Sequence, residues 1–147
     1  MNPYLDAGFL LALVAKLPGT SVASNLVRTI PAPISLNALH QLQVENMLVR
    51  FQHDRDPKIR AGGNQGQQLW RRYLDEGVFT FGPADWDVAF RNAIAWNRLL
   101  PDSPPSPWLF LHPAMALASG ATRFFSFDPR TRQLASVHGI KPIPESL

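Results

Sequence analysis

Short apolar segments alternate along this chain with longer segments that have a helical pattern. The apolar segments read as strands near residues 3–6, 31–35, 78–81, 123–127 and 140–143. Short apolar strands separated by helices are typical of a parallel sheet that is buried on both faces. We therefore predict an α/β fold, a three-layer sandwich in which helices cover both faces of a central parallel sheet.

The helical segments are separated by clear breaks. Helices are predicted near residues 9–16, 21–28, 37–52, 67–75, 85–100 and 108–119, with a short one before the last strand. Either Ser35 or Asn37 is expected to cap the third of them. The segment DRDPKIRAGGNQG, residues 54–66, is predicted to interrupt the helical pattern because it combines charge, proline and glycine. Residues 101–107 (PDSPPSP) are predicted to form a stiff loop. Too little chain follows this loop to build a second core, so residues 1–147 are expected to form a single domain.

The amino-acid composition limits the kinds of site and partner that this chain can have. The chain has no cysteine, which excludes disulfides, thiolate zinc sites and a cysteine nucleophile and fits a reducing cytoplasm. The apolar run GFLLALVAKL follows Asp6 and lacks a basic stretch before it, so we do not expect a signal peptide. Eleven of the fourteen cations are arginine, and the net charge is +3. This balance favours a nucleic-acid partner mildly, and codon usage explains it equally well.

Two aspartates end predicted strands. Asp6 follows PYL, and Asp128 follows RFFSF. Ligands of an open parallel sheet gather at the carboxyl ends of its strands, and a buried aspartate needs a partner or a cation. Both residues also precede predicted helices, where aspartate commonly serves as an N-cap. The pattern alone leaves both roles open.

Three segments resemble a known family. They are YLDAGFLLALV, ISLNALHQLQVENML and LHPAMALASGATRFFSFDPRTRQLASVHGIKPIP. Together they are similar to PIN domains of the VapC type, the toxin ribonucleases of toxin–antitoxin systems, and the third is the most specific. The resemblance spans nearly the whole chain and implies a Rossmann-like sandwich. It also implies a ring of carboxylates that holds Mg²⁺ or Mn²⁺, which would activate a water for RNA cleavage.

The resemblance carries over only part of that carboxylate ring. Asp6 and Asp128 match two of the family's acids, and both are implied as catalytic residues and metal ligands. Gln43 stands where the family has a glutamate, and Leu109 stands where it has another aspartate. Gln43 still offers a carbonyl oxygen and is kept as a candidate catalytic residue, whereas Leu109 offers no ligand. The site therefore resembles a metal centre that has lost part of its charge.

Glu45 is the nearest acid to the missing glutamate. Residues two apart on a helix point about 200° away from each other. We therefore predict that Glu45 lies on the solvent face of its helix, together with Gln41, and that it does not replace Gln43.

These observations lead to three hypotheses. The preferred one is a PIN-like protein with weak or no nuclease activity that acts by binding RNA or a protein. The alternatives are an active Mg²⁺- or Mn²⁺-dependent endoribonuclease and an interaction module with neither metal nor RNA affinity. The resemblance further implies a small antitoxin partner and a homodimer, and we expect no membrane association.

The basic residues that could line an RNA path are Arg50, Arg55, Lys58, Arg60, Arg71 and Arg72. Acids are interleaved with them, which favours an ordinary mixed surface.

Overall fold

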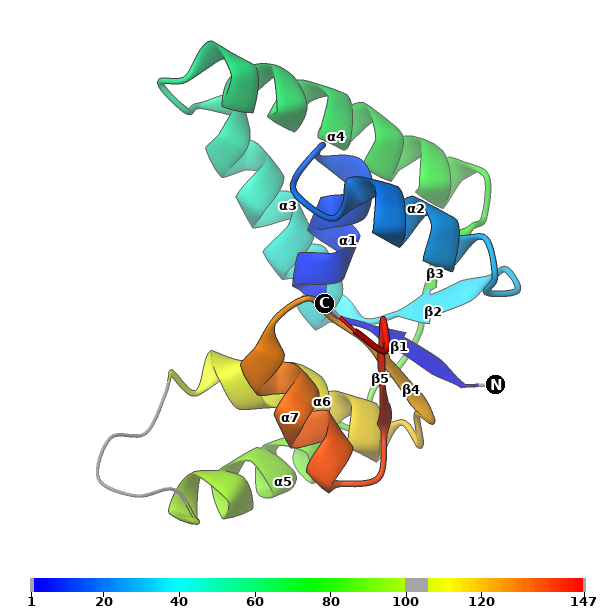
Figure 1. The fold of residues 1–147 in the computed structure, drawn as a ribbon, viewed down its shortest axis with the longest axis vertical. Helices are drawn as coiled ribbons and strands as arrows, with labels where there is room; N and C mark the ends of the chain where they lie inside the picture. The colour runs from blue at the N-terminus through cyan, green and yellow to red at the C-terminus, as the bar shows by residue number, and fades with distance from the viewer. Residues whose placement is uncertain (1, 100–105, 147) are drawn as a thin grey trace. The chain divides into compact units, whose positions relative to one another are not determined.

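The fold is described by a computed structural model, which covers residues 2–99 and 106–146. The described residues form a mixed α/β structure with seven helices and five short strands (Figure 1). They fall into two compact units. The first unit comprises residues 1–6 and 83–147, and the second comprises residues 7–82.

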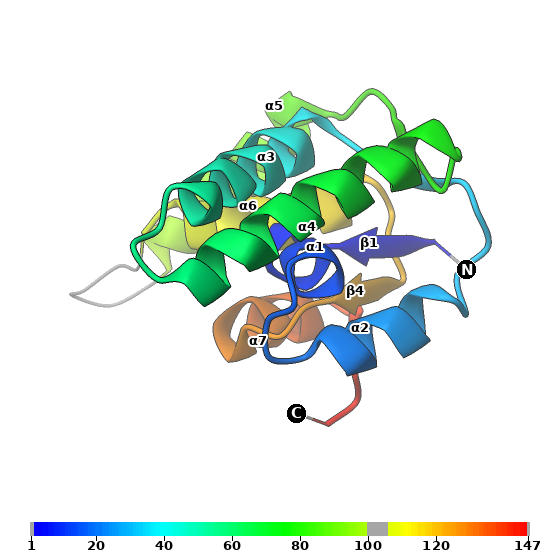
Figure 2. The same cartoon turned by 90° about the horizontal axis from the view of Figure 1, so that it is seen from above.

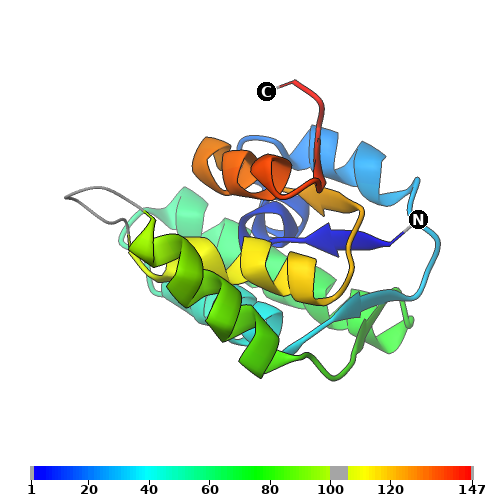
Figure 3. The same ribbon diagram turned by 90° about the horizontal axis from the view of Figure 1, so that it is seen from below.

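The first unit contains a three-stranded parallel sheet and three helices (Figure 3). Its elements are β1 (Pro3–Leu5), α5 (Trp86–Arg98), α6 (Trp108–Ala118), β4 (Arg123–Phe125), α7 (Pro129–Val137) and β5 (Lys141–Ile143). The strand order is β1-β4-β5, so β4 lies in the middle. In this sheet Leu5 pairs with Phe125, which in turn pairs with Ile143. Helix α6 packs against both α5 and α7.

The second unit is mostly helical. Its elements are α1 (Ala7–Val14), α2 (Thr20–Val27), β2 (Ile34–Leu36), α3 (Ala38–Gln52), α4 (Pro57–Asp75) and β3 (Phe79–Phe81). Strands β2 and β3 pair in parallel. Helix α1 is apolar almost all round and packs against α2, α3 and α4, as expected of a helix buried within a core. Helices α3 and α4 lie side by side (Figure 2).

Side-chain caps mark the starts of α3, α4, α5 and α7. Asn37 accepts hydrogen bonds from the backbone N–H groups of Leu39 and His40, and the His40 ring accepts one from the Asn37 backbone, which completes a capping box for α3. Asp56 caps α4 and Asp85 caps α5 more simply, each by accepting one hydrogen bond from a backbone N–H group. The predicted starts near residues 37 and 85 are therefore confirmed.

The predicted break at residues 54–66 is wrong beyond Asp56. Helix α4 begins at Pro57 and runs without interruption through both glycines of AGGNQG. Gly63 and Gly66 are buried, and a Cβ atom on either would lie 2.7 Å from an atom of α3. The glycines therefore permit close packing of α4 rather than breaking it. Of the predicted proline loop, residues 101–105 lie outside the described residues.

The predicted parallel pairing is confirmed, because all three strand ladders of the described residues are parallel. They form two sets, β1-β4-β5 and β2-β3, instead of one continuous ladder. The three-layer arrangement stays a prediction. Within the described ranges, no helix is both long and apolar enough to cross a membrane.

Candidate functional site

Asp6 and Asp128 both follow strands of the first unit. Strands β1 and β4 are parallel neighbours, and Leu5 is in register with Phe125. The backbone N–H of Asp6 donates to the carbonyl oxygen of Phe125 at 2.9 Å, which extends the ladder by one residue. Asp6 is only 5% exposed. Both aspartates thus follow the carboxyl ends of adjacent strands, the place where an α/β sheet presents ligand-binding groups.

The carboxylate of Asp128 already has partners within its own segment. It caps α7 by accepting hydrogen bonds from the backbone N–H groups of Arg130, at 2.8 Å, and Thr131, at 3.3 Å. The guanidinium of Arg130 also donates to both carboxylate oxygens, through Nη2 at 2.9 Å and Nε at 3.3 Å. Both oxygens of Asp128 therefore accept hydrogen bonds, and its charge is balanced by a neighbour two residues away.

These contacts shift the titration of both partners. Partial burial alone would raise the pKa of Asp128, but the hydrogen bonds from Arg130 and Thr131, with the positive charge of Arg130, hold this pKa below its ordinary value of 3.8. The same ion pair raises the pKa of the Arg130 guanidinium. Asp128 is therefore ionised in the folded protein at any pH near neutrality.

The lowered pKa predicts how Asp128 affects stability. Because its pKa is lower in the folded than in the unfolded chain, its stabilising contribution is present above pH 4 and is lost as the pH falls through the folded-state value. We expect urea unfolding from pH 6 to pH 2.5 to show a smaller acid-induced loss of stability in an Asp128→Asn variant than in the native protein. Asparagine keeps the cap but does not titrate. An equal loss in both proteins would contradict this role.

A network of polar side chains surrounds the start of α7. The hydroxyl groups of Ser126 and Thr131 are hydrogen-bonded at 2.9 Å. Arg132, which is 8% exposed, donates to the carbonyl oxygens of Ser126 and Pro144. Burial lowers the pKa of the Arg132 guanidinium. Sequence reasoning missed Arg130 and Arg132, although a basic residue shortly after a strand-end aspartate was a visible signal for an ion pair.

The remaining candidates lie on two other helices. Gln43 is half-buried on α3, in the second unit, whereas Asp6 and Asp128 belong to the first. Leu109 is half-buried in the first turn of α6. Glu45 is also half-buried, and it accepts a hydrogen bond from the indole N–H of Trp70 at 3.3 Å. The exposed Gln41 also donates to Glu45 at 3.2 Å, so the predicted shared face of these two residues is confirmed. That face is not fully open to solvent at Glu45, because Trp70 of α4 covers part of it.

The arrangement fits a divalent cation poorly. Mg²⁺ and Mn²⁺ require several hard oxygen ligands, usually including one or two carboxylates. Within residues 2–99 and 106–146, no group of three or more histidine, aspartate or glutamate side chains is placed to hold a metal ion. At the sheet edge, Asp128 is engaged by Arg130.

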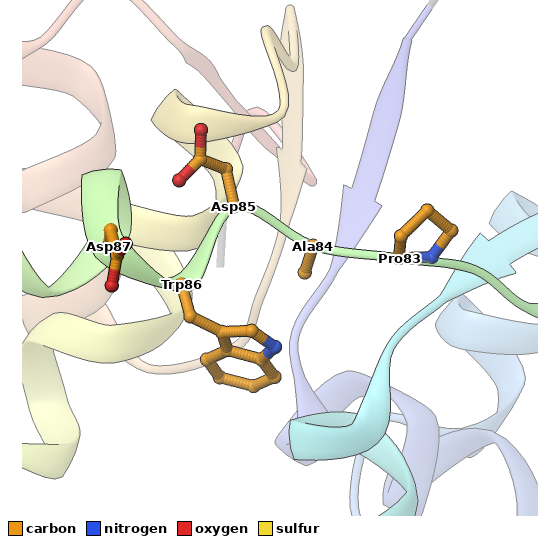
Figure 4. A pocket seen from close by; sticks show the side chains of 5 residues that line it. All are labelled: Pro83, Ala84, Asp85, Trp86 and Asp87. Atoms are coloured by element: carbon orange, nitrogen blue, oxygen red, sulfur yellow. The ribbon is translucent and has the colours of Figure 1, made fainter.

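Two surface features of the described residues also contain charged side chains. The basic residues of α3, α4 and the segment between them are exposed, but Arg72 pairs with Glu76 at 3.9 Å, as expected for a mixed face. A shallow pocket is lined by residues 83–87, and its side chains include two carboxylates and the indole of Trp86 (Figure 4). Asp85 caps α5 by accepting from Val88 at 3.0 Å, so one of the two carboxylates already serves the helix.

Comparison with known proteins gives no further guide. No protein-family model, curated protein or solved structure matches this chain.

Proposed function

We propose that this chain is a PIN-like protein of the VapC type that acts by binding RNA or a protein partner and cleaves RNA weakly or not at all. The observation that supports this proposal best is the ion pair between Asp128 and Arg130 at 2.9 Å. A carboxylate whose two oxygens both accept hydrogen bonds from an arginine is a poor metal ligand, since the metal must first displace that arginine.

The substitutions in the sequence support the same conclusion. Asp6 offers one carboxylate at the end of β1, while Gln43 and Leu109 replace two acids that the resemblance implies. In this proposal, the chain has a three-layer PIN-like sandwich and retains only remnants of its acid site. The antitoxin and the second copy of the chain that the resemblance implies are proposed as partners on the same basis.

Calorimetric titration with Mn²⁺ tests the proposal without requiring knowledge of the RNA. We expect little or no Mn²⁺ binding by the native protein. A Gln43→Glu/Leu109→Asp variant that also carries Arg130→Gln should bind at least about tenfold more tightly, because it has more carboxylates and frees Asp128. The matched control is Arg91→Gln, which removes an exposed arginine of α5 and should leave Mn²⁺ binding unchanged.

The opposite result would favour the active endoribonuclease. If the native protein binds Mn²⁺ as tightly as the restored variant, and Asp6→Asn abolishes that binding, then the site is a working metal centre. The proposal of a degenerate site would then be wrong.

A further inference from the structure

A pocket in the second unit lies where three helix ends meet. Phe51, the second-last residue of α3, forms one part of the pocket wall. The chain leaving α1 contributes Ala15, Lys16 and Leu17, and the first turns of α4 contribute Lys58, Ile59, Ala61, Gly62 and Gln65. Its volume is about 360 Å³, which lies within the range of about 300–1,000 Å³ that small-molecule sites occupy.

The charge of this pocket is positive. It contains Lys16 and Lys58, two of the three lysines in a chain whose other cations are all arginine. No carboxylate is among its lining residues. Neither lysine forms an ion pair within the described part of the chain. The nearby Asp56 carboxylate accepts a hydrogen bond from the backbone N–H of Lys58, so it is occupied as the cap of α4.

The backbone of Lys16 is strained. Its φ is 51°, and it is the only residue other than glycine with a positive φ among those described. Helices commonly end in this left-handed conformation, but glycine normally occupies the position because a side chain there costs about 1 kcal/mol or more. Residues held in such conformations are concentrated at functional sites, which favours a ligand-binding function for the Lys16 side chain.

Apart from the two lysines and the amide of Gln65, the lining of the pocket is mostly apolar. Ala15 is buried, and Leu17 and Phe51 are half-buried. Ile59 is 41% exposed and adds further apolar surface. A Cβ atom on Gly62 would lie 3.2 Å from the carbonyl oxygen of Ala15, closer than an ordinary contact, so glycine lets α4 approach the chain that leaves α1.

We propose that this pocket binds a small organic anion, in which an apolar or aromatic body carries one phosphate or carboxylate group. The anionic group lies between the ammonium groups of Lys16 and Lys58, and the body packs against Leu17, Phe51 and Ile59. Lysine ammonium groups act as mobile point charges that suit such a group, and the apolar wall selects against simple inorganic ions. This site is independent of the acid residues and of the function proposed for them.

Calorimetry or NMR titration with phenyl phosphate, benzoate and inorganic phosphate tests the proposal. We expect the native protein to bind at least one of the two aromatic anions more tightly than inorganic phosphate. Lys58→Gln should weaken that binding about tenfold. The control Arg71→Gln removes an exposed cation further along α4 and should leave the affinity unchanged.

The comparison between phenyl phosphate and benzoate distinguishes a phosphate ligand from a carboxylate ligand. The proposal is overturned if the native protein binds neither aromatic anion, or if inorganic phosphate binds equally well. It is also overturned if Arg71→Gln weakens binding as much as Lys58→Gln, because the attraction is then only that of a generally basic surface.

A Lys16→Gly variant separates binding from folding. Glycine relieves the strained φ, so we expect the midpoint of thermal unfolding to stay the same or to rise, while the affinity for the aromatic anion falls about tenfold. A lower midpoint with unchanged affinity would show that Lys16 serves the end of α1 and not a ligand, and would overturn the proposal.

Discussion

Replacing Gly63 by alanine is expected to destabilise the second unit by about 1–3 kcal/mol, although alanine is the better helix former. A Cβ atom at this position would lie 2.7 Å from the backbone nitrogen of Gln52 and 2.9 Å from the backbone carbonyl carbon of Phe51. Both are main-chain atoms in the last turn of α3, so no side-chain rotation can relieve the clash. The two helices must move apart, which loosens the packing between them.

The neighbouring residue provides the control. Asn64 is exposed on α4, and Asn64→Ala should leave stability unchanged or raise it by up to about 0.7 kcal/mol through helix propensity alone. Urea unfolding measures both effects, and hydrogen exchange of the α3 and α4 amides assigns the loss to this unit. If the Gly63→Ala variant were as stable as the Asn64→Ala variant, the proposed close packing of α3 against α4 at Gly63 would be contradicted.

The second large effect is expected at Arg132. Replacing it by methionine keeps much of the apolar volume but removes the donors to the carbonyl oxygens of Ser126 and Pro144. Hydrogen bonds from a charged donor contribute about 1.5–3 kcal/mol each, and buried acceptors left without a donor add a cost of their own. We expect a loss of about 2–4 kcal/mol in the free energy of unfolding of the first unit.

Two further variants make this prediction specific. Arg132→Lys should recover only part of the stability, because one ammonium group does not reproduce the fork of a guanidinium that reaches two carbonyl oxygens. Gln133→Met places the same new side chain on the adjacent exposed position and should change stability by less than about 0.5 kcal/mol. Equal unfolding midpoints in urea for Arg132→Met and Gln133→Met would contradict the role of Arg132.

Local signals in the sequence were sufficient for most helices and strands. The capping residues Asn37 and Asp85 mark the starts of α3 and α5, because caps act within one turn of a helix. The sequence predicts helix α4 only from residue 67 onward, because charge, proline and glycine in residues 54–66 all weaken the local helical signal. The compensating packing against α3 depends on chain that is distant in sequence, which local propensity does not report.

The candidate site was harder to predict than the fold. The positions of Asp6 and Asp128 after strands are visible in the sequence, but a local pattern does not distinguish a metal ligand from a helix cap at Asp128. In the structure Asp128 caps α7 and forms an ion pair with Arg130. The hydrogen bond between Glu45 and Trp70 joins two helices across 25 residues of sequence. Such tertiary contacts decide which side of a helix is covered, and no single-helix pattern contains them.

The order of the two units along the chain has a consequence for how the protein is made. Residues 7–82 form one continuous unit, inserted between β1 and the rest of the first unit. Strand β1 leaves the ribosome before the inserted unit, and its partner β4 follows about 120 residues later, since Leu5 pairs with Phe125. At about 5–20 residues per second, that strand waits roughly 6–24 s for its neighbour. The inserted unit can complete its own contacts during this interval, so we expect it to fold on the ribosome before the three-stranded sheet exists.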